Sequence, residues 1–425
     1  MKTMLGCGIA LLTAALAQGA AMVTVDGVTV DAAARCVKVD YTLTGEDAIV
    51  TASFTTNGAP VAAERSTALV GDVNRWVRLG TNESAAASFT WYAQSDLGDL
   101  SVDGVAVELA LWSAANPPDY MAVNLAANSN VTYYVSTNAL PGGLGSDRWR
   151  VNELLMRKIK AKGVTFPMGK NTPDTSRIRE HAVTLTNDFY IGVFELTQGQ
   201  LINIFGRDTY IATFNWTTRN KYTNGVDSAT RPADNLIWRL LRGNNLGYQA
   251  PRSFLVDNWS ILGKLRAKCG LEIDLPTEAM WEFACRGGSE ARNYYAAMGL
   301  TLNDVARNYT NGGTNNGGLW TPDVGADKGT ARVGSYAPNA YGLYDMYGNV
   351  HELCYDRGAP LTDGKAVVDP LGHASNDQCV GRGGCASITD EKWYTSAMRA
   401  TPTITSMNNP NFGDIYGARL ALRLP

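Results

Sequence analysis

Cysteine is the residue type in this chain whose placement bears most directly on chemistry. The 425 residues include seven cysteines but only three histidines, and the histidines, His181, His351 and His373, show no metal-binding spacing. A cysteine can act as a nucleophile, ligate a soft metal or close a disulfide. Which of these applies depends on the compartment and on the neighbours of each thiol.

The N-terminus has the features of a secretory signal peptide. Lys2 is followed by an apolar stretch over residues 4–17 and by small residues up to Ala21. The stretch is shorter than the ~20 apolar residues of a membrane-spanning helix. We therefore expect residues 1–21 to be a signal peptide and the protein to be secreted, periplasmic or on the cell surface, with no later integral membrane segment. Cys7 would leave with the signal.

The remaining cysteines have several interpretations, because a cysteine in an exported domain is more often bridged than reactive. Cys354 could pair with Cys379 or with Cys385, and Cys379 and Cys385 could instead bridge one another. Cys385 could also be a lone reactive thiol, which makes it the candidate catalytic residue. Cys285 is either buried and free or paired with Cys269. We favour structural roles, but spacing alone does not choose among the pairings.

Composition and motifs exclude several classes of function. Lysine plus arginine number 37 against 40 aspartate plus glutamate, and the formal charge of −3 is spread without blocks, so we expect no nucleic-acid binding. The sequence contains no glycine-rich phosphate loop ending in Lys-Ser/Thr and no Gly-x-Ser-x-Gly motif. It therefore gives no support for a nucleotide-binding enzyme or a serine hydrolase.

Two carboxylates with a glycine between them form a candidate metal loop. Asp345 and Glu352 flank Gly348, which would let the loop fold back so that backbone carbonyls converge. Calcium, a hard cation, takes about six to eight oxygen ligands from carboxylates, amides and carbonyls. The alternative is that Asp345 and Glu352 cap turns or pair with arginine.

The elements that would position these residues begin with a β-rich region. Apolar and polar residues alternate over residues 37–43, 105–111 and 121–125, with turn sequences between the expected strands. This pattern predicts an antiparallel β-sandwich, immunoglobulin- or fibronectin-like, over residues 22–140. Cys36 is its one cysteine, and the region shows no catalytic constellation.

Beyond residue 140 the pattern becomes irregular. Residues 141–161 begin with Pro-Gly-Gly-Leu-Gly and are expected to form a linker to a domain over residues 162–425. In that domain we expect helices after Thr197, over residues 258–268 and after Thr277, among many Gly-, Asn- and Asp-rich loops. The chain as a whole is therefore expected to be α+β.

Six ordered segments carry a resemblance to a known family, over about residues 162–425. They resemble the formylglycine-generating enzyme, or sulfatase-modifying factor, family. The resemblance implies a C-type-lectin-like fold with little regular secondary structure and calcium-stabilised loops. The segments are residues 163–169, 183–197 (VTLTNDFYIGVFELT), 275–288 (LPTEAMWEFACRGG), 333–352 (VGSYAPNAYGLYDMYGNVHE), 382–384 (RGG) and 417–420 (GARL).

The resemblance also implies calcium as a cofactor at two sites. In the first, Gly348 and Val350 would act through their backbone oxygens. The positions that match the first site are Asp345, Gly348, Val350 and Glu352, and those that match the second are Asn308, Tyr309 and Asp327.

The family's catalytic chemistry depends on a pair of cysteines that this chain lacks. A formylglycine-generating enzyme oxidises a cysteine of a sulfatase peptide with a reactive pair that binds copper(I), a soft ion that prefers thiolates. The pair follows an Arg-Gly-Gly-Ser motif, whereas here no cysteine follows Cys385, which stands at the Ser position. His351 stands where the family usually has Trp, and Ser396 stands where it has the disulfide partner of Cys285. Copper is therefore not expected.

The predicted function is binding rather than oxidation. An exported, calcium-braced scaffold without the cysteine pair would use its groove for a peptide or glycan, and a sulfatase is one candidate partner. The alternatives are an oxidoreductase that converts a sulfatase cysteine to formylglycine through a divergent site, and a structural cell-surface protein. The residues leave open whether the protein is an enzyme. The groove residues that suit stacking or hydrogen bonding are Trp393, Tyr394, Arg399 and Tyr416.

Overall fold

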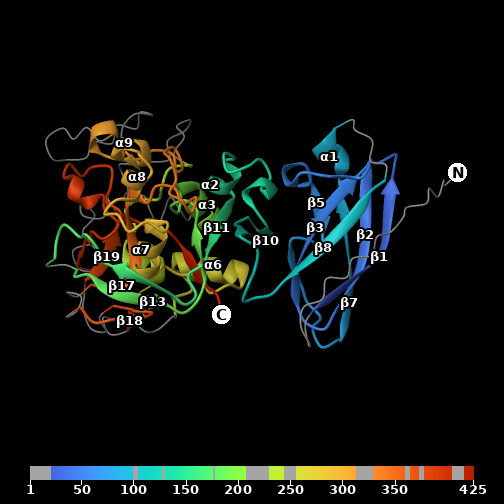
Figure 1. Ribbon diagram of the computed structural model, residues 1–425, viewed down its shortest axis with the longest axis horizontal. Coiled ribbons are helices and arrows are strands. Elements are labelled where there is room, and N and C mark those ends of the chain that lie inside the picture. Colours follow the sequence, from blue (N-terminus) through green and yellow to red (C-terminus); the bar gives the residue numbers. More distant parts are fainter. Residues whose placement is uncertain are drawn as a thin grey trace. The chain divides into compact units, whose positions relative to one another are not determined.

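The computed structural model divides the chain into two compact units (Figure 1). The first unit takes in the chain up to Ala122 and Val131–Ser146, and the second takes in Val123–Asn130 and Asp147–Pro425. The residues that the structure describes are 21–98, 104–126, 130–175, 178–206, 229–243, 255–312, 329–358, 364–372, 378–403 and 416–425.

The first unit consists of two antiparallel sheets. One sheet has the strand order β1-β2-β7-β5, and in the other β3 pairs with β4, β6 and β8. The unit boundary falls within β9 (Tyr120–Asn124). The elements of the first unit are β1 (Met22–Asp31), β2 (Cys36–Thr44), β3 (Ala48–Thr56), β4 (Ala59–Pro60), η1 (Ala63–Arg65), β5 (Leu69–Gly71), β6 (Arg75–Val77), β7 (Ser84–Trp91), α1 (Ala93–Leu97), β8 (Ala106–Trp112), β10 (Val131–Tyr134) and η2 (Thr137–Ala139).

One apolar core holds these two sheets together. The alternation in β2 buries Val37, Val39 and Tyr41 completely, as expected for a strand with one face on a core. They share a cluster with Phe54 of β3, whose ring stacks on Trp91 of β7 with centroids 4.3 Å apart. Because β2 and β7 belong to one sheet and β3 to the other, the predicted antiparallel β-sandwich is confirmed.

The second unit is built from short elements. β14 pairs with β11 and β21, β13 with β12 and β18, β17 with β19 and β20, and β15 with β16. This mixture of small sheets and short helices confirms the α+β class. The strands are β11 (Glu153–Ile159), β12 (Val164–Met168), β13 (His181–Leu185), β14 (Phe189–Gly192), β15 (Ala306–Arg307), β16 (Tyr347–Gly348), β17 (His351–Arg357), β18 (Val367–Val368), β19 (Cys379–Arg382), β20 (Tyr416–Gly417) and β21 (Ala421–Arg423). The helices are α2 (Arg148–Val151), α3 (Gln198–Phe205), α5 (Trp238–Arg242), α6 (Ile261–Cys269), α7 (Glu278–Arg286), α8 (Tyr294–Ala297), α9 (Leu302–Val305), α10 (Tyr309–Gly312) and η3 (Glu391–Trp393).

The three predicted helices are confirmed, and local capping explains where they start. Thr197 forms a capping box with Gln200 at the start of α3, and Ser260 accepts a hydrogen bond from Gly263 N at the start of α6. Thr277 caps α7 by accepting from Met280 N at 3.2 Å. All nine side chains of α7 are buried, so this helix lies wholly inside the second unit.

The segment expected to be a linker is structured over much of its length. Within residues 141–161 the chain forms α2 and β11, and the second unit includes the chain from Asp147 onward. The reason is that β11 is a core strand, whose Leu155 and Met156 are buried and which pairs with β14. The predicted signal peptide lies outside the described residues apart from Ala21. Among the described residues, none of the helices combines the length and the apolar composition of a membrane-spanning segment.

Candidate functional site

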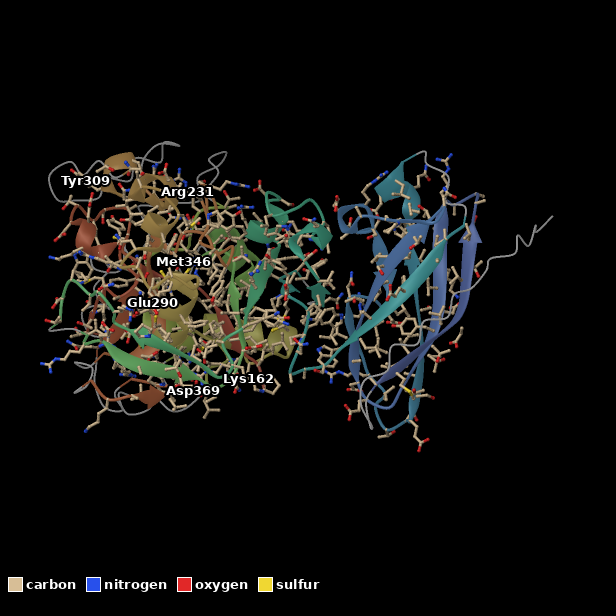
Figure 2. All side chains as sticks on the ribbon, in the orientation of Figure 1. Lys162, Arg231, Glu290, Tyr309, Met346 and Asp369 are labelled. Atoms are coloured by element: carbon tan, nitrogen blue, oxygen red, sulfur yellow. The ribbon has the colours of Figure 1, made fainter. Side chains whose placement is uncertain are left out.

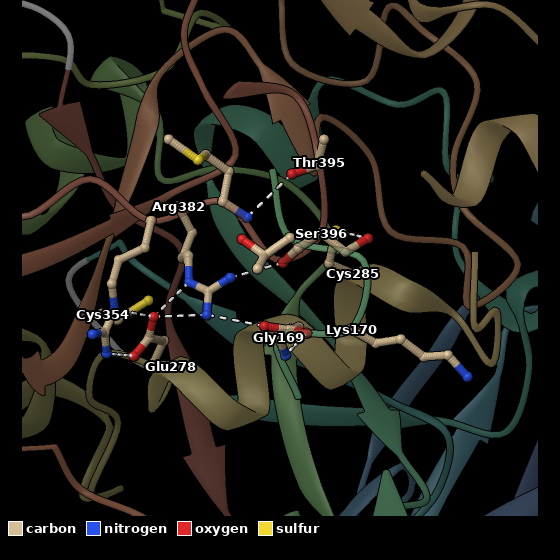
Figure 3. A network of polar contacts seen from close by, with 12 residues as sticks. Gly169, Lys170, Glu278, Cys285, Cys354, Arg382, Thr395 and Ser396 are labelled. Atoms are coloured by element: carbon tan, nitrogen blue, oxygen red, sulfur yellow. Dashed lines mark hydrogen bonds and ion pairs between the residues drawn. The ribbon is translucent and has the colours of Figure 1, made fainter. Parts of the chain in front are cut away.

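A network of buried ion pairs connects α7 to β19 in the second unit (Figure 3). Arg382 of β19 donates from Nε to Glu278 Oε1 at 2.8 Å and from Nη2 to Glu282 Oε2 at 3.0 Å. Its Nη1 donates to the backbone oxygen of Ser396 at 2.8 Å, so each of the three guanidinium nitrogens has a hydrogen-bond partner. Arg399 donates from Nε to Glu278 Oε1 at 2.7 Å. The network therefore joins α7 to two later segments, across 104 and 121 positions of sequence.

Electrostatics keeps these groups charged although they are buried. Burial raises the pKa of Glu278, but Arg382 and Arg399 outweigh this effect and lower the pKa to about 2. Burial lowers the pKa of Arg382, and Glu278 and Glu282 more than restore it. Removing one partner would leave an uncompensated charge in the interior, which is far costlier than losing a surface pair.

Glu352 belongs to a second buried ion pair rather than to an open loop. Both of its carboxylate oxygens accept from Nε of Arg419, at 3.0 and 2.9 Å, and Oε1 also accepts from Nη2 at 2.6 Å. Oε2 accepts from Nε1 of Trp281 at 2.6 Å. The arginine-pairing alternative considered for this carboxylate is thus what the structure contains.

Asp345 is the carboxylate of the predicted calcium loop that keeps an available oxygen. Its Oδ2 accepts from Gly334 N at 2.6 Å, while Oδ1 is buried without a hydrogen-bond partner. A further buried carboxylate, Glu195, accepts from Asn349 Nδ2 at 2.8 Å and from Val350 N at 3.1 Å. Burial raises the pKa of Asp345 to about 6 and raises that of Glu195 well above its usual range, and nearby carboxylates add to both effects.

A calcium ion would fit this loop in part. The available oxygen of Asp345 suits a hard cation. Gly348 has φ +80°, and a side chain there would collide with the backbone of Arg307, so the tight loop requires glycine. Glu352, by contrast, has no oxygen to offer while it holds Arg419. Within the described ranges, His, Cys, Asp and Glu side chains form no group of three or more that could hold a metal. Calcium at this loop stays a prediction.

The second predicted calcium set is only partly described. Asn308 is buried, and its Oδ1 accepts from Thr310 N at 2.8 Å and from Thr310 Oγ1 at 2.6 Å. Tyr309, labelled in Figure 2, is half-buried at the start of α10. Asp327 lies outside the described residues. The side-chain oxygen of Asn308 therefore closes a local turn.

The thiols are placed for packing rather than for chemistry. Cys385 is fully buried, and burial raises the pKa of its thiol to about 11, which disfavours the thiolate that a nucleophile needs. Cys354 and Cys385 are free thiols, so none of the disulfides considered for them is formed. Cys285 is buried and free, with Sγ 3.6 Å from Ser396 Oγ, and Cys269 is a separate half-buried thiol. Of the two alternatives for Cys285, the buried free thiol is therefore confirmed.

The predicted groove residues fall into two groups. Tyr416 stacks on His351 with ring centroids 5.2 Å apart, and Trp393 meets the same imidazole edge-on at 5.8 Å. Tyr394 and Arg399 lie in the interior, and Tyr416 is buried as well at 4% exposed. The Tyr394 hydroxyl donates to the backbone oxygens of Cys385 and Ile388 at 2.7 and 2.8 Å, and Arg399 holds Glu278. Both residues are corrected from groove residues to core residues, because their polar groups are used internally.

His351 is central to the group that does come together. It is 3% exposed, burial lowers its pKa to about 4, and its Nδ1 is buried without a hydrogen-bond partner. We define the His351 cluster as His351, Trp393 and Tyr416. His351 and Tyr416 are buried and Trp393 is half-buried, so the cluster reaches the surface through Trp393 and also holds an unsatisfied ring nitrogen.

Glu195 and Arg419 are among the site residues that sequence reasoning missed. Glu195 interrupts an apolar run, and Arg419 lies in the last of the resembling segments, yet neither received a role. A charged residue within an apolar core segment signals a buried pair, because its burial alone would be too costly. That signal was available for Glu195 in residues 183–197.

Comparison with known proteins shows the family to which the chain is similar. Residues 152–424 match the family described as "Sulfatase-modifying factor enzyme 1-like domain". The formylglycine-generating enzyme of Streptomyces coelicolor is 41% identical over 149 residues, covering 32% of this chain and 45% of that protein. That of Thermomonospora curvata is 39% identical over 121 residues, covering 26% and 37%. The Bos taurus protein named "Inactive C-alpha-formylglycine-generating enzyme 2" is 29% identical over 237 residues, covering 49% and 73%.

The matches to the formylglycine-generating enzymes are partial, since the chain spans less than half of the length of these two enzymes. Among solved structures, Treponema denticola variable protein 1 is 24% identical with a TM-score of 0.46, covering 64% of this chain and 95% of that one. PvdO from Pseudomonas aeruginosa is 20% identical with a TM-score of 0.43, covering 64% and 95%. The family match includes every residue of the ion-pair network and of the His351 cluster, and on its extent the chain belongs to the sulfatase-modifying factor enzyme 1-like family.

Proposed function

We propose that this protein is an exported, non-catalytic member of its family that binds a peptide or glycan at the His351 cluster. One observation carries the proposal. No cysteine follows Cys385, and Cys385 itself is a buried thiol with its pKa raised to about 11. No thiolate pair can therefore form after the Arg-Gly-Gly segment, where the family has its copper-binding cysteines.

The His351 cluster supports binding. Aromatic rings stack on apolar faces of sugars and peptides, and an imidazole nitrogen hydrogen-bonds a hydroxyl or amide. Trp393 is half-buried, so part of its ring reaches the surface. A scaffold of this family can present such a surface without the reactive cysteine pair, because a fold does not by itself determine the chemistry of its site. The proposal is supported by the Bos taurus relative, whose name describes it as inactive.

Export, calcium and the lectin-like character of the fold are parts of the same proposal. Export rests on the apolar N-terminal segment. Calcium rests on the available oxygen of Asp345 and on the tight turn at Gly348. An extracellular calcium concentration would suit a weak site of this kind, at about 10⁻⁴–10⁻³ M. A sulfatase is one source of a peptide ligand.

The absence of oxidase activity is tested first. The purified mature chain is incubated with copper(I) and a Cys-x-Pro-x-Arg peptide, and the peptide mass is followed. We expect no aldehyde and no copper uptake. Aldehyde formation that is lost in Cys385→Ser would overturn the proposal in favour of a divergent oxidase.

Binding is tested on glycan and peptide arrays, with and without a calcium chelator. We expect retention that the chelator weakens and that Trp393→Ala abolishes. Trp259→Ala is the matched control, because Trp259 is a 42% exposed tryptophan of the same unit and outside the cluster. A blank array, or equal loss in both variants, would count against the His351 cluster as the binding surface.

A further inference from the structure

A buried asparagine beside the His351 cluster carries polar atoms that the proposed function does not use. Asn235 is 2% exposed, and both its Nδ2 and its Oδ1 are buried without a hydrogen-bond partner. Its backbone has φ +56°, in the left-handed region that asparagine tolerates better than most residues. Buried polar side chains are normally hydrogen-bonded, so an amide with two orphaned atoms calls for a specific explanation.

Contacts with β20 place Asn235 next to Tyr416. The backbone nitrogen of Leu236 donates to Tyr416 O at 2.9 Å. Three residues earlier, the oxygen of Ala233 lies so close to β20 that a Cβ at Gly417 would be 2.8 Å from it. The chain between these two contacts, which includes Asn235, therefore arches along β20.

His351 lies on the other edge of the same strand. Its parallel pairing partner in β20 is Tyr416, and the two rings stack with centroids 5.2 Å apart. The carbonyl of a strand residue points to one edge, and that of Tyr416 points to Leu236. Asn235 and His351 therefore lie on opposite sides of Tyr416. With neighbouring strands about 4.8 Å apart, their backbones are separated by roughly 10 Å.

The orphaned nitrogen of His351 is a hydrogen-bond acceptor. Burial lowers the pKa of this ring, and a hydrogen bond to the backbone of Arg382 acts in the opposite direction, so the ring is the donor in that bond. Nδ1 is the nitrogen that is buried without a partner. In a neutral imidazole one nitrogen donates and the other accepts, so Nδ1 would accept from an N–H or O–H of a ligand.

Together the two residues match a secondary amide. Such an amide is trans and carries its N–H and its C=O on opposite sides. Its N–H can donate to His351 Nδ1 while its oxygen accepts from Asn235 Nδ2, and the two protein nitrogens would then be about 8 Å apart. This separation is compatible with side chains that reach inward from backbones on either side of Tyr416. The plane of the amide would lie against the Tyr416 ring.

Burial decides which kind of amide can enter. Asn235, His351 and Tyr416 are at most 4% exposed. A chain that continues on both sides of its amide cannot reach them, whereas an acetamido group, which ends in a methyl, can be inserted. Trp393 is half-buried and remains for the ring that carries this group. An N-acetylated sugar has such a ring, and the hydroxyl next to its acetamido group can donate to Asn235 Oδ1.

We infer that the His351 cluster and Asn235 recognise the acetamido group of an N-acetylated glycan, with the sugar ring against Trp393. The inference rests on the proposed function, because it specifies the ligand class of the same site. It narrows the ligand from a peptide or glycan to one chemical group, and it gives a role to the orphaned amide of Asn235.

The test uses the full mature chain and diacetylchitobiose, a disaccharide of two N-acetylated sugars, with titration calorimetry as the readout. Cellobiose is the matched probe, because it has the same linkage but hydroxyls in place of the acetamido groups. We expect a Kd of about 1 mM or tighter for diacetylchitobiose and about 10-fold weaker binding of cellobiose.

Two variants test the named atoms. Asn235→Gly removes the amide at a backbone conformation that glycine adopts freely, and it should weaken diacetylchitobiose binding by about 10-fold. His351→Phe keeps a ring against Tyr416 but removes Nδ1, and we expect a similar effect. Asn171→Gly is the matched control, because Asn171 is an exposed asparagine of the same unit with φ +59°. Thermal unfolding shows whether each variant folds.

Several results would overturn the inference. Cellobiose that binds as tightly as diacetylchitobiose would do so and would leave the proposed function intact, since a glycan would still bind. A peptide with an acetylated lysine carries the acetamido group without the sugar ring, and tighter binding of that peptide would replace the glycan by a peptide ligand. No binding of diacetylchitobiose at about 10 mM, or an equal Kd in Asn235→Gly, would also overturn it. Failure of the proposed function itself would be seen instead as blank glycan and peptide arrays.

Discussion

The two units of this protein solve the problem of burial in different ways. Among the described residues of the first unit, Thr51 is the one buried polar side chain, and its hydroxyl accepts from Trp112 Nε1 at 2.9 Å. The second unit buries many charged groups, including Glu278, Arg382 and Arg419. The first unit is therefore held by apolar periodicity, whereas the second relies on specific ion pairs between segments distant in the sequence. Stability in the second unit should depend on single polar atoms and on pH in a way that the first does not.

The largest difference between the units is expected from Glu278→Gln. This change leaves Arg382 and Arg399 without their shared carboxylate in the interior, and we expect it to lower the free energy of unfolding by about 3–5 kcal/mol. Differential scanning calorimetry should show a lower transition for the second unit only. The control is Glu290→Gln, since Glu290 pairs with Lys170 on the surface and its loss should leave the transition unchanged. Equal effects of the two substitutions would contradict a stabilising network.

The next largest difference between the units is expected in their stability at acid pH. The pKa of Glu278 is about 2 in the folded chain, against 4.5 for an ordinary glutamate. Its contribution to the free energy of unfolding is therefore fully present above pH 4.5 and is lost as pH falls towards 2. The loss amounts to about 3 kcal/mol. We expect the second unit to unfold first when pH is lowered through this window. Tryptophan fluorescence and calorimetry measure the unfolding. In Glu278→Gln the slope with pH should be shallower, and an unchanged slope would assign the acid sensitivity to other groups.

A smaller effect is expected from the core of the first unit. Phe54→Leu removes the stacking on Trp91 and should cost about 1–2 kcal/mol at any pH between 3 and 8. Urea titrations at several pH values measure this directly. A pH-dependent loss would mean that the first unit also depends on titratable groups, and the contrast between the units would then be weaker.

The smallest effect, with no change in stability, concerns the thiols. In the native protein we expect iodoacetamide to label Cys36 and Cys269, which are half-buried, before Cys285, Cys354 and Cys385, which are fully buried. Peptide mass mapping after short labelling gives the order. Fast labelling of Cys385 would contradict this expectation and would support the alternative that Cys385 is a reactive thiol.

The sequence predicted the first unit well because its information is local. Apolar and polar residues alternate along β2 because one face of the strand packs on the core. This alternation can be recognised from neighbouring residues alone. The helices of the second unit were also predictable, since Thr197 and Thr277 cap them within a single turn.

The candidate site was predictable only in part, because its contacts are not local. The resembling segments contained Glu278, Glu352, Arg382 and Arg419, but spacing along the chain could not show that they pair with one another. For the same reason Arg399 was assigned to a groove, although it reaches Glu278 across 121 positions of sequence. Trp393 and Tyr416 were identified as aromatic candidates, and the shared contact with His351 appears only in three dimensions.

Helix α7 has a consequence for the dynamics of the second unit. Its nine side chains are all buried, and among them Glu278 accepts from Arg382 and Trp281 donates to Glu352. No partial opening can therefore expose its backbone without breaking several of these contacts together. Its amide hydrogens should exchange with solvent deuterium at the rate of global unfolding, so hydrogen exchange in α7 measures the opening of the entire unit.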